Sequence, residues 1–411
     1  MSEQSFVIIG GGFAAAKAAE TLRAEDFTGR VTIIGAETHT PYERPPLSKG
    51  YLLGKDQLDV VYPHDDAWYR AHDVGLRLGH AVERLDPSSH QLTLSGGDTL
   101  SFDKALLVTG SRPRHLDLPG TDLDGVLYLR TIDDSERLRS VLGDGVQVVV
   151  IGAGWIGLEV AAAARSYGAT VTIVEPQEVP LSNVMGSRMG DYFAALHREN
   201  GVELRLGTTV DHLDGEDGRV TGVVTGDGAT IPASVVIVGV GVVPNVELAE
   251  RAGLKVDNGV VTDEWLRTSH PDIYAAGDVA RSFRPFYGSH VRVEHWGNAL
   301  ETGPAAARNM LGRQVPFEQI PYFFTDQYDL GMEYVGWFPP GGFHKVVIRG
   351  AVEEKKFHAF WLDHDRVVAG MHVNLWDEGI DPVRDLIRGR AIVSPVKLAD
   401  PGIPLAEATA D

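Results

Sequence analysis

Two stretches of the chain share one order of apolar and small residues. In the first, Val7–Ile9 is a β-branched run typical of a strand buried on both faces. It passes through closely spaced glycines into the alanine-rich segment Ala14–Arg23, which indicates a helix, and a second apolar strand follows at Val31–Ile34. The same order returns at Val149–Ile151, Leu158–Tyr167 and Val171–Val174. The sequence therefore predicts two β-α-β units of the dinucleotide-binding kind.

Around these units the pattern predicts further strands, and the composition of the strands changes near the C-terminus. Leu76–Leu85 and Gln91–Phe102 alternate like a small antiparallel sheet, Val202–Val224 like hairpin strands, and Val235–Val240 like a buried strand. From about Pro316 the strands become shorter and richer in aromatic residues. We therefore expect an α/β protein with two Rossmann-like domains and a C-terminal α+β domain. The expected boundaries are 1–110 with 242–315, then 111–241, then 316–411.

The glycines of each loop have separate tasks in a site of this kind. The first permits the tight turn, the second allows close approach of a pyrophosphate, and the third position lets helix and strand pack closely. Phosphate oxygens then accept hydrogen bonds from free N–H groups at the helix N-terminus. The positions concerned are Gly10, Gly12 and Ala15 in the first copy and Gly152, Gly154 and Gly157 in the second.

An acidic residue follows the second strand of each unit. Glu175 comes directly after Val171–Val174, where a carboxylate can accept hydrogen bonds from both ribose hydroxyls and repel a 2′-phosphate. This favours NADH over NADPH, and the alternative is a surface acid at a strand end. In the first copy the acid is delayed to Glu37, so either Glu37 or backbone groups contact the adenosine ribose.

The chain contains no cysteine. This excludes disulfide bonds, thiolate nucleophiles, cysteine-ligated zinc and iron–sulfur clusters within the chain. Any redox chemistry must therefore come from a bound organic cofactor.

Net charge and the length of the apolar runs exclude some classes of binding partner. A formal net charge of −20 argues against binding to nucleic acid or anionic membranes, and apolar runs such as Ala233–Val243 are too short to span a bilayer. Met1–Gln4 leads into the first strand without a basic signal region, so we expect a cytoplasmic protein. The 15 histidines show no paired ligand spacing, so no metal site is expected, and Ser48 lies in no Gly-x-Ser-x-Gly turn.

A third motif, Pro41–Lys49, lies between the two units and reads Pro-Tyr-Glu-Arg-Pro-Pro-Leu-Ser-Lys. With the glycine loops, Thr109-Gly110, Gly239–Asn245, Ala276–Asp278 and Glu294–Ala299, it resembles the oxygenase-coupled NADH-dependent ferredoxin reductases of the glutathione-reductase-like flavoprotein superfamily. The resemblance covers nearly the whole chain. It implies that the first loop binds FAD and the second NADH, which makes 1–110 with 242–315 the FAD-binding domain and 111–241 the NADH-binding domain.

The resemblance also implies contacts for individual residues. Arg44 is expected near the FAD pyrophosphate, Asp278 on the ribityl chain and Arg130 near the flavin. The positions expected to contact FAD are Gly10, Gly12, Phe13, Ala14, Ala15, Glu37, Arg44, Lys49, Val82, Thr109, Gly110, Arg130, Gly277, Asp278, Glu294, His295 and Trp296. Those expected to contact NADH are Gly152, Gly154, Trp155, Ile156, Gly157, Glu159, Glu175, Gly239 and Gly241.

Three residues are expected to take part in catalysis. By resemblance Lys49 lies beside the isoalloxazine N5, where a cation stabilises negative charge on the reduced ring. Glu159 pairs with that lysine in the family, although an acid in the first turn of a helix also complements the helix dipole. The resemblance also implies that Trp296 packs near the flavin, at the face where electrons leave. The family commonly has a second tryptophan where this chain has Phe324.

The implied activity is electron transfer from NADH through FAD to a small iron–sulfur ferredoxin, of the [2Fe–2S] or [3Fe–4S] type, that serves a cytochrome P450 or a ring-hydroxylating dioxygenase. The alternatives are an NADH-dependent reductase of rubredoxin, quinone or small acceptors, and a redox-sensing interaction protein similar to apoptosis-inducing factor. Docking of an acidic ferredoxin would require a local basic patch. The candidates for it are Arg281, Arg284, Arg292, Lys345, Arg349, Lys355 and Lys356.

Overall fold

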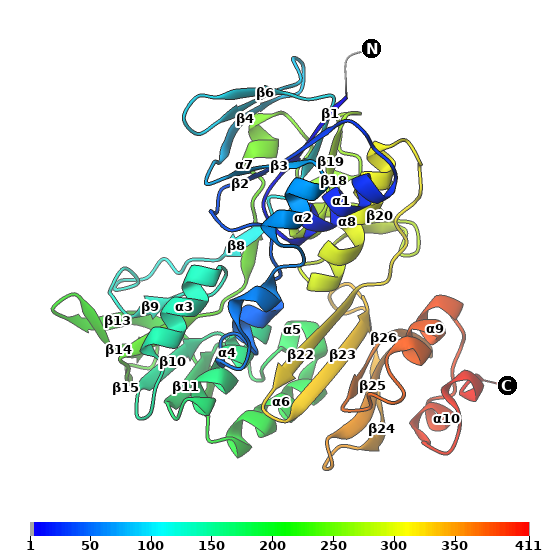
Figure 1. Ribbon diagram of the computed structural model, residues 1–411. Helices are drawn as coiled ribbons and strands as arrows, with labels where there is room; N and C mark the ends of the chain where they lie inside the picture. The colour runs from blue at the N-terminus through cyan, green and yellow to red at the C-terminus, as the bar shows by residue number, and fades with distance from the viewer. Residues whose placement is uncertain (1–3, 411) are drawn as a thin grey trace. The chain divides into compact units, whose positions relative to one another are not determined.

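The computed structural model describes residues 4–410, which form two compact units (Figure 1). The first unit contains the described residues up to Pro45 together with Gln57–Arg112 and Val242–Pro321. The second contains Pro46–Asp56, Pro113–Gly241 and the described residues from Tyr322 onwards. The expected NADH-binding and C-terminal domains thus fall in one unit, and their separate boundaries stay a prediction.

A five-stranded parallel sheet of order β19-β7-β1-β2-β3 forms the centre of the first unit. Alternate residues of β1 face opposite sides, so that Phe6 and Ile8 enter one core while Val7 and Ile9 enter the other. Burial on both faces explains why the central strands are continuous apolar runs. The strands are β1 (Ser5–Ile9), β2 (Arg30–Gly35), β3 (Val74–Leu78), β7 (Lys104–Leu107) and β19 (Ile273–Ala275).

Helices α1 (Phe13–Ala24) and α8 (Trp296–Met310) pack together on one face of this sheet (Figure 1). Small residues permit the close contact, because a Cβ on Gly303 would lie 2.5 Å from the carbonyl oxygen of Ala14. Smaller sheets and short helices complete the unit. They are α2 (Asp66–Ala71), β4 (Val82–Asp86), β5 (Gln91–Leu94), β6 (Thr99–Ser101), β17 (Val242–Pro244), α7 (Glu247–Arg251), β18 (Val260–Thr262), β20 (Ala280–Arg284) and β21 (Ser289–Arg292).

A second parallel sheet, of order β12-β11-β10-β16-β9, forms the centre of the Rossmann-like part of the second unit. Its strands are β9 (Val126–Leu127), β10 (Gln147–Ile151), β11 (Thr170–Glu175), β12 (Glu203–Leu206) and β16 (Val235–Val238). The accompanying elements are α3 (Ile132–Val141), α4 (Trp155–Ser166), α5 (Ser182–Met185), α6 (Ser187–Glu199), β13 (Val210–Glu216), β14 (Arg219–Thr225) and β15 (Thr230–Pro232). Strand β8 (Ser111–Pro113) pairs with β17, and its first two residues belong to the first unit.

The C-terminal part is a five-stranded antiparallel sheet with helix α9 against β26 and β23 (Figure 1). Its order is β22-β23-β26-β25-β24. The elements are β22 (Tyr322–Gln327), β23 (Leu330–Gly336), β24 (Lys345–Ala351), β25 (Lys356–Asp363), β26 (Arg366–Val373), α9 (Asp381–Gly389) and α10 (Pro395–Ala399). The predicted fold class, two Rossmann-like parts and a C-terminal α+β part, is confirmed.

Two segments expected to be purely antiparallel are not. Leu76 lies in β3, which pairs in parallel with β2, and the antiparallel sheet begins only at β4 beyond Gly79. Likewise β12, at the start of Val202–Val224, pairs in parallel with β11. Both are edge strands of a parallel sheet, so exposed and less exposed residues alternate along them as they do in an antiparallel strand.

Among the described helices, none has both the length and the apolar composition needed to cross a membrane.

Replacement of Gly157 by alanine is expected to destabilise the protein by about 2 kcal/mol or more. The added Cβ would lie 2.2 Å from the carbonyl oxygen of Gly152, so the backbone would have to shift. Chemical unfolding followed by circular dichroism measures the loss. Gly154→Ala is the matched control, because its Cβ would meet only the Gly239 carbonyl oxygen, at 3.8 Å. Equal losses of stability in the two variants would contradict this explanation.

Candidate functional site

The first glycine loop opens toward free space at the N-terminus of α1. Gly10 has φ +127°, and a Cβ there would lie 2.1 Å from the Val108 carbonyl oxygen, so only glycine fits. Gly12 is the N-cap of α1, and no side chain among the described residues caps this end of the helix. A Cβ on Gly12 would meet nothing within 4 Å. Phe13, Ala14 and Ala15 form the buried first turn behind the opening. The donors and the space suit a diphosphate.

The second loop repeats this arrangement at the N-terminus of α4. Gly152 has φ +100°, and a Cβ there would lie 2.5 Å from the Gly239 carbonyl oxygen. Gly154 is the N-cap, and within residues 4–410 no side chain caps the helix. Trp155 and Ile156 begin the helix, and Ile156 is 42% exposed. Gly241, φ +95°, faces open space. The second loop therefore also fits a diphosphate.

The acidic residue of the second copy lies against its own glycine loop. Oε2 of Glu175 accepts a hydrogen bond from the Ala153 N–H at 2.7 Å, and Oε1 accepts one from the Gln177 N–H at 3.0 Å. The carboxylate is thus fixed beside the loop, which is the position required to meet a ribose. Its contact with a nucleotide stays a prediction.

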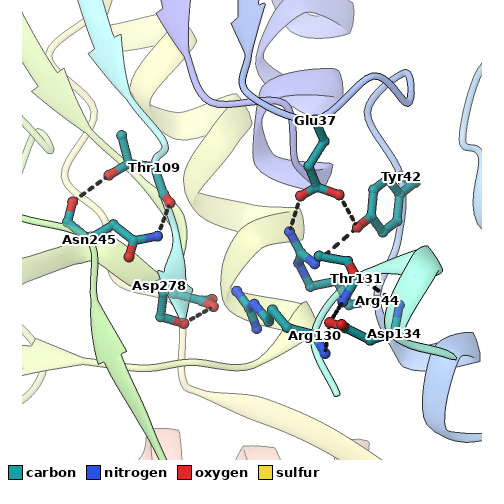
Figure 2. A network of polar contacts seen from close by, with 10 residues as sticks. Glu37, Tyr42, Arg44, Thr109, Arg130, Thr131, Asp134, Asn245 and Asp278 are labelled. Atoms are coloured by element: carbon teal, nitrogen blue, oxygen red, sulfur yellow. Dashed lines mark hydrogen bonds and ion pairs between the residues drawn. The ribbon is translucent and has the colours of Figure 1, made fainter. Parts of the chain in front are cut away.

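In the first copy the acidic residue is bound to two neighbours (Figure 2). Glu37 accepts hydrogen bonds from the Tyr42 hydroxyl at 2.6 Å and from the Arg44 guanidinium at 3.1 Å. Burial alone would lower the pKa of Arg44, but Tyr42, Glu37 and Asp278 together raise it above its ordinary value. Arg44 is therefore a firmly held cation, and Glu37 orients it.

The turns that follow β7 and β19 are held by side-chain hydrogen bonds. Thr109 donates to the Asn245 carbonyl oxygen at 2.8 Å, and the Asn245 amide donates to the Thr109 carbonyl oxygen at 2.7 Å (Figure 2). The Ser111 hydroxyl donates to Asp278 at 2.9 Å, and the Gly277 N–H donates to Thr302 at 2.9 Å. These bonds fix the predicted turns Thr109-Gly110 and Gly277-Asp278.

Trp296 begins α8 and contacts the first loop. Its ring stacks on Phe13 with centroids 5.6 Å apart, and its indole N–H donates to Glu43 at 2.8 Å. Partial burial raises the pKa of Glu43, against the effects of this hydrogen bond and of Lys17. Sequence reasoning did not assign Glu43, although it lies inside the motif Pro41–Lys49.

The remaining predicted FAD residues have structural settings of their own. Val82 begins β4 at the edge of a core, and Glu294 pairs with Arg292. Desolvation lowers the pKa of His295 to about 4, which keeps it neutral. Arg130 belongs to the second unit and precedes α3, whose N-terminus is closed by reciprocal hydrogen bonds between Thr131 and Asp134 (Figure 2).

Glu159 is a buried carboxylate of α4 with three side-chain donors. It lies just beyond the first turn of the helix, which contains no acidic residue, so the first-turn position expected from the sequence is wrong. Its Oε2 accepts from the Ser48 hydroxyl at 2.5 Å, and its Oε1 accepts from Lys49 Nζ at 2.7 Å and from the Thr325 hydroxyl at 2.6 Å. The side chains of Glu159 and Lys49 are 4% and 12% exposed. Lys49 Nζ also lies 5.3 Å from the ring centroid of Phe324. The expected contact between Lys49 and Glu159 is therefore present.

Sequence reasoning missed Ser48 and Thr325. Ser48 was considered only as a nucleophile, and Thr325 was passed over beside Phe324. A polar residue in the strand β22, on the opposite face from Phe324, was the available signal for Thr325.

The proposed set of basic docking residues is partly wrong. Arg284 and Arg349 are buried, at 2% and 8% exposure. Arg284 donates to Asn298 and to the Gln319 carbonyl oxygen, and Arg349 donates to the Asp400 carbonyl oxygen. Both are internal structural cations. Of the others, Arg281, Arg292 and Lys355 pair with acids, and Lys345 and Lys356 are exposed.

Two histidine–aspartate groups in the described residues come close enough to share an ion. They are His90, His270 and Asp272, and His344, Asp363 and His364. Each contains hydrogen bonds between its own members: His90 contacts Asp272 at 3.1 Å, and both histidines of the other group contact Asp363 at 2.8 Å. These contacts explain both groups without a metal, whose predicted absence stays a prediction.

Comparison with known proteins identifies the relatives of this chain. Residues 4–303 match the model of the pyridine nucleotide-disulphide oxidoreductases, and residues 322–409 match that of the reductase C-terminal domain. The ferredoxin–NAD(+) reductase component of the anthranilate 1,2-dioxygenase system of Burkholderia cepacia is 41% identical over 98% of this chain and 99% of its own length. Rhodocoxin reductase of Rhodococcus erythropolis is 40% identical over 90% of this chain and 86% of its own length.

A solved structure shows the same fold. The reductase in a crystal structure of a covalent putidaredoxin reductase–putidaredoxin complex superimposes with a TM-score of 0.94 at 37% identity, over 99% of this chain and 98% of its own. The family expected from the motifs is thereby confirmed. The chain belongs to the oxygenase-coupled ferredoxin–NAD(+) reductases, a branch of the pyridine nucleotide-disulphide oxidoreductases.

Proposed function

We propose that this protein transfers electrons from NADH, through bound FAD, to a small iron–sulfur ferredoxin that serves a cytochrome P450 or a ring-hydroxylating dioxygenase. The observation that carries the proposal is a pair of uncapped, glycine-lined helix N-termini, one in each unit, in a chain without cysteine. Two dinucleotides can be held, and no dithiol of the chain can take up the electrons. The electrons must therefore pass to another molecule.

The chain's own residues divide the binding between them. The N-terminus of α1 and the fixed Arg44 cation would hold the FAD diphosphate, and the N-terminus of α4 would hold that of NADH. Glu175, held against its loop by the Ala153 N–H, would accept hydrogen bonds from the ribose hydroxyls. When bound, FAD supplies the redox chemistry, because it accepts two electrons from a nicotinamide and passes them on singly.

Lys49, held by Glu159, would supply a positive charge beside the flavin. Lys49 is held by Glu159 at 2.7 Å and is largely removed from water, so its charge is weakly screened. Such a cation stabilises negative charge on a neighbouring reduced ring. Ser48 and Thr325 orient the carboxylate that holds it. A cytoplasmic location is part of the proposal, because NADH is supplied there.

A ferredoxin acceptor predicts a defined result in cytochrome c reduction by NADH. We expect purified [2Fe–2S] or [3Fe–4S] ferredoxins to stimulate the rate roughly tenfold or more. Rubredoxin and a soluble quinone, tested in parallel, serve as the alternative acceptors. Rates that no ferredoxin increases would refute the proposal, and stimulation by rubredoxin or quinone alone would favour the alternative reductase.

The ribose contact predicts a preference of roughly 100-fold in kcat/KM for NADH over NADPH. Glu175→Gln keeps an acceptor for the Ala153 N–H but removes the charge that repels a 2′-phosphate. It is therefore expected to reduce the preference to about tenfold, mainly by raising the efficiency with NADPH. Equal efficiency of the wild-type protein with the two nucleotides would contradict the role of Glu175.

Lys49→Met is expected to slow reduction of the flavin by NADH roughly 10- to 100-fold in anaerobic stopped-flow measurements. It should also cost about 3 kcal/mol of stability, because Glu159 would be left as an unpaired buried charge. The double variant Lys49→Met/Glu159→Gln separates the two effects, since removal of the charge should restore stability but not the rate. Recovery of both, or an unchanged rate in Lys49→Met, would remove the lysine from the mechanism.

A further inference from the structure

A continuous chain of hydrogen bonds leads away from Glu159 through the interior of the second unit. Oγ1 of Thr325 lies 2.6 Å from Glu159, and Nε2 of Gln327 lies 3.2 Å from Oγ1 of Thr325. Oε1 of Gln327 lies 2.9 Å from Nε2 of His197, whose Nδ1 lies 3.1 Å from the Tyr328 hydroxyl. All five residues belong to the second unit.

Local structure explains how these side chains meet. Thr325 and Gln327 are two residues apart in β22, so they point to the same face of the strand. His197 comes from the last turn of α6. Thr325, Gln327 and His197 are each no more than 1% exposed. Water is therefore excluded from these three side chains, and their polar atoms must find hydrogen-bond partners in one another.

The hydrogen bonds between Tyr328 and Glu159 all run in one direction. Only the amide nitrogen of Gln327 can donate, and it faces Thr325, so its carbonyl oxygen faces His197. Nε2 of His197 must then carry the proton, which leaves Nδ1 to accept from the Tyr328 hydroxyl. Desolvation lowers the pKa of His197 to about 4, so the ring is neutral near pH 7 and has one tautomer to adopt.

The same logic fixes the hydroxyl that meets Glu159. Because Oγ1 of Thr325 accepts from Gln327, its own hydrogen is directed to the carboxylate. Every donated hydrogen from Tyr328 to Thr325 thus points toward Glu159. Hydrogen bonds aligned in this way polarise one another, which strengthens the last of them.

We propose that Gln327 and His197 are positioning residues for reduction of the flavin by NADH, which act by orienting Thr325 toward Glu159 and thereby holding Lys49. The proposal rests on the proposed function in that Lys49 is taken to act on the flavin. None of these residues other than Lys49 and Glu159 was assigned a role from the sequence. Gln327 and His197 act at a distance, through the carboxylate.

The first test is spectroscopic and needs neither NADH nor ferredoxin. In the oxidised holoprotein labelled with ¹⁵N-histidine, the His197 signal, assigned by its loss in His197→Gln, should show the Nε2–H tautomer. Thr325→Val should shift this signal toward a mixture of tautomers, although residue 325 does not touch His197, and Thr325→Ser should restore it. Tyr192→Phe is the control, because its buried hydroxyl on the same helix has no hydrogen-bond partner among the described residues. A His197 signal that stays the same in Thr325→Val would overturn the proposal.

The second test measures anaerobic flavin reduction by NADH, before any ferredoxin takes part. Gln327→Met should lower the limiting rate roughly three- to tenfold and change the dissociation constant of NADH less than twofold. Thr325→Val should behave alike, and Thr325→Ser should recover most of the rate. An unchanged rate in Gln327→Met with a lowered unfolding midpoint would reduce the chain to a structural role. Because the measurement ends at the flavin, failure of ferredoxin to act as acceptor would not affect it.

Discussion

The buried carboxylate of Glu159 joins segments of the second unit that lie far apart in the sequence. A carboxylate that is 4% exposed requires donors. Removal of one partner of a buried ion pair leaves an uncompensated charge and costs roughly 3–5 kcal/mol. Distant segments of the chain supply them: Ser48 and Lys49 come from the short segment Pro46–Asp56, and Thr325 from β22. These contacts join the segment to the unit that contains α4, together with the hydrogen bonds of Ser135 and Tyr167 to its backbone. The carboxylate is thus an element of the fold as well as a holder of Lys49.

The two glycine loops share one backbone arrangement but have different neighbours. In both, a positive-φ glycine passes beside a strand-end carbonyl oxygen, and an uncapped helix N-terminus follows. They differ where their surroundings differ. Gly157 leaves no room for a Cβ, whereas Ala15 is fully buried at the matching position. Glu175 supports its own loop, whereas Glu37 holds Arg44. Glu37 therefore orients a cation and Glu175 supports a loop, although both follow the second strand of their unit in the sequence.

The parts of the fold that were predicted correctly depend on local signals. β-branched runs, close glycines and alanine-rich helices are readable within about 30 residues, so both dinucleotide-binding parts could be found. Edge strands such as β3 were misread, because exposure of one side gives them the alternation of an antiparallel strand. Arg284 and Arg349 were misread because a cationic residue is assumed to be exposed. The contacts of Thr325 and His197 join residues more than 100 positions apart, and no local pattern marks them.

The aromatic residue at position 324 takes its meaning from this polar centre. Lys49 lies 5.3 Å from the ring centroid of Phe324 while it is bound to Glu159, so the ring and the carboxylate hold the same cation. A tryptophan offers a stronger cation–π attraction than a phenylalanine, but either ring presents a negative face to the ammonium group. Phe324 therefore preserves the electrostatic part of the position that is commonly a tryptophan in the family. Because β22 carries Phe324 on one face and Thr325 and its hydrogen bond to Glu159 on the other, a single strand positions both partners of the lysine. The position of Lys49 can thus be retained when the aromatic residue changes, as long as β22 keeps its place beside α4.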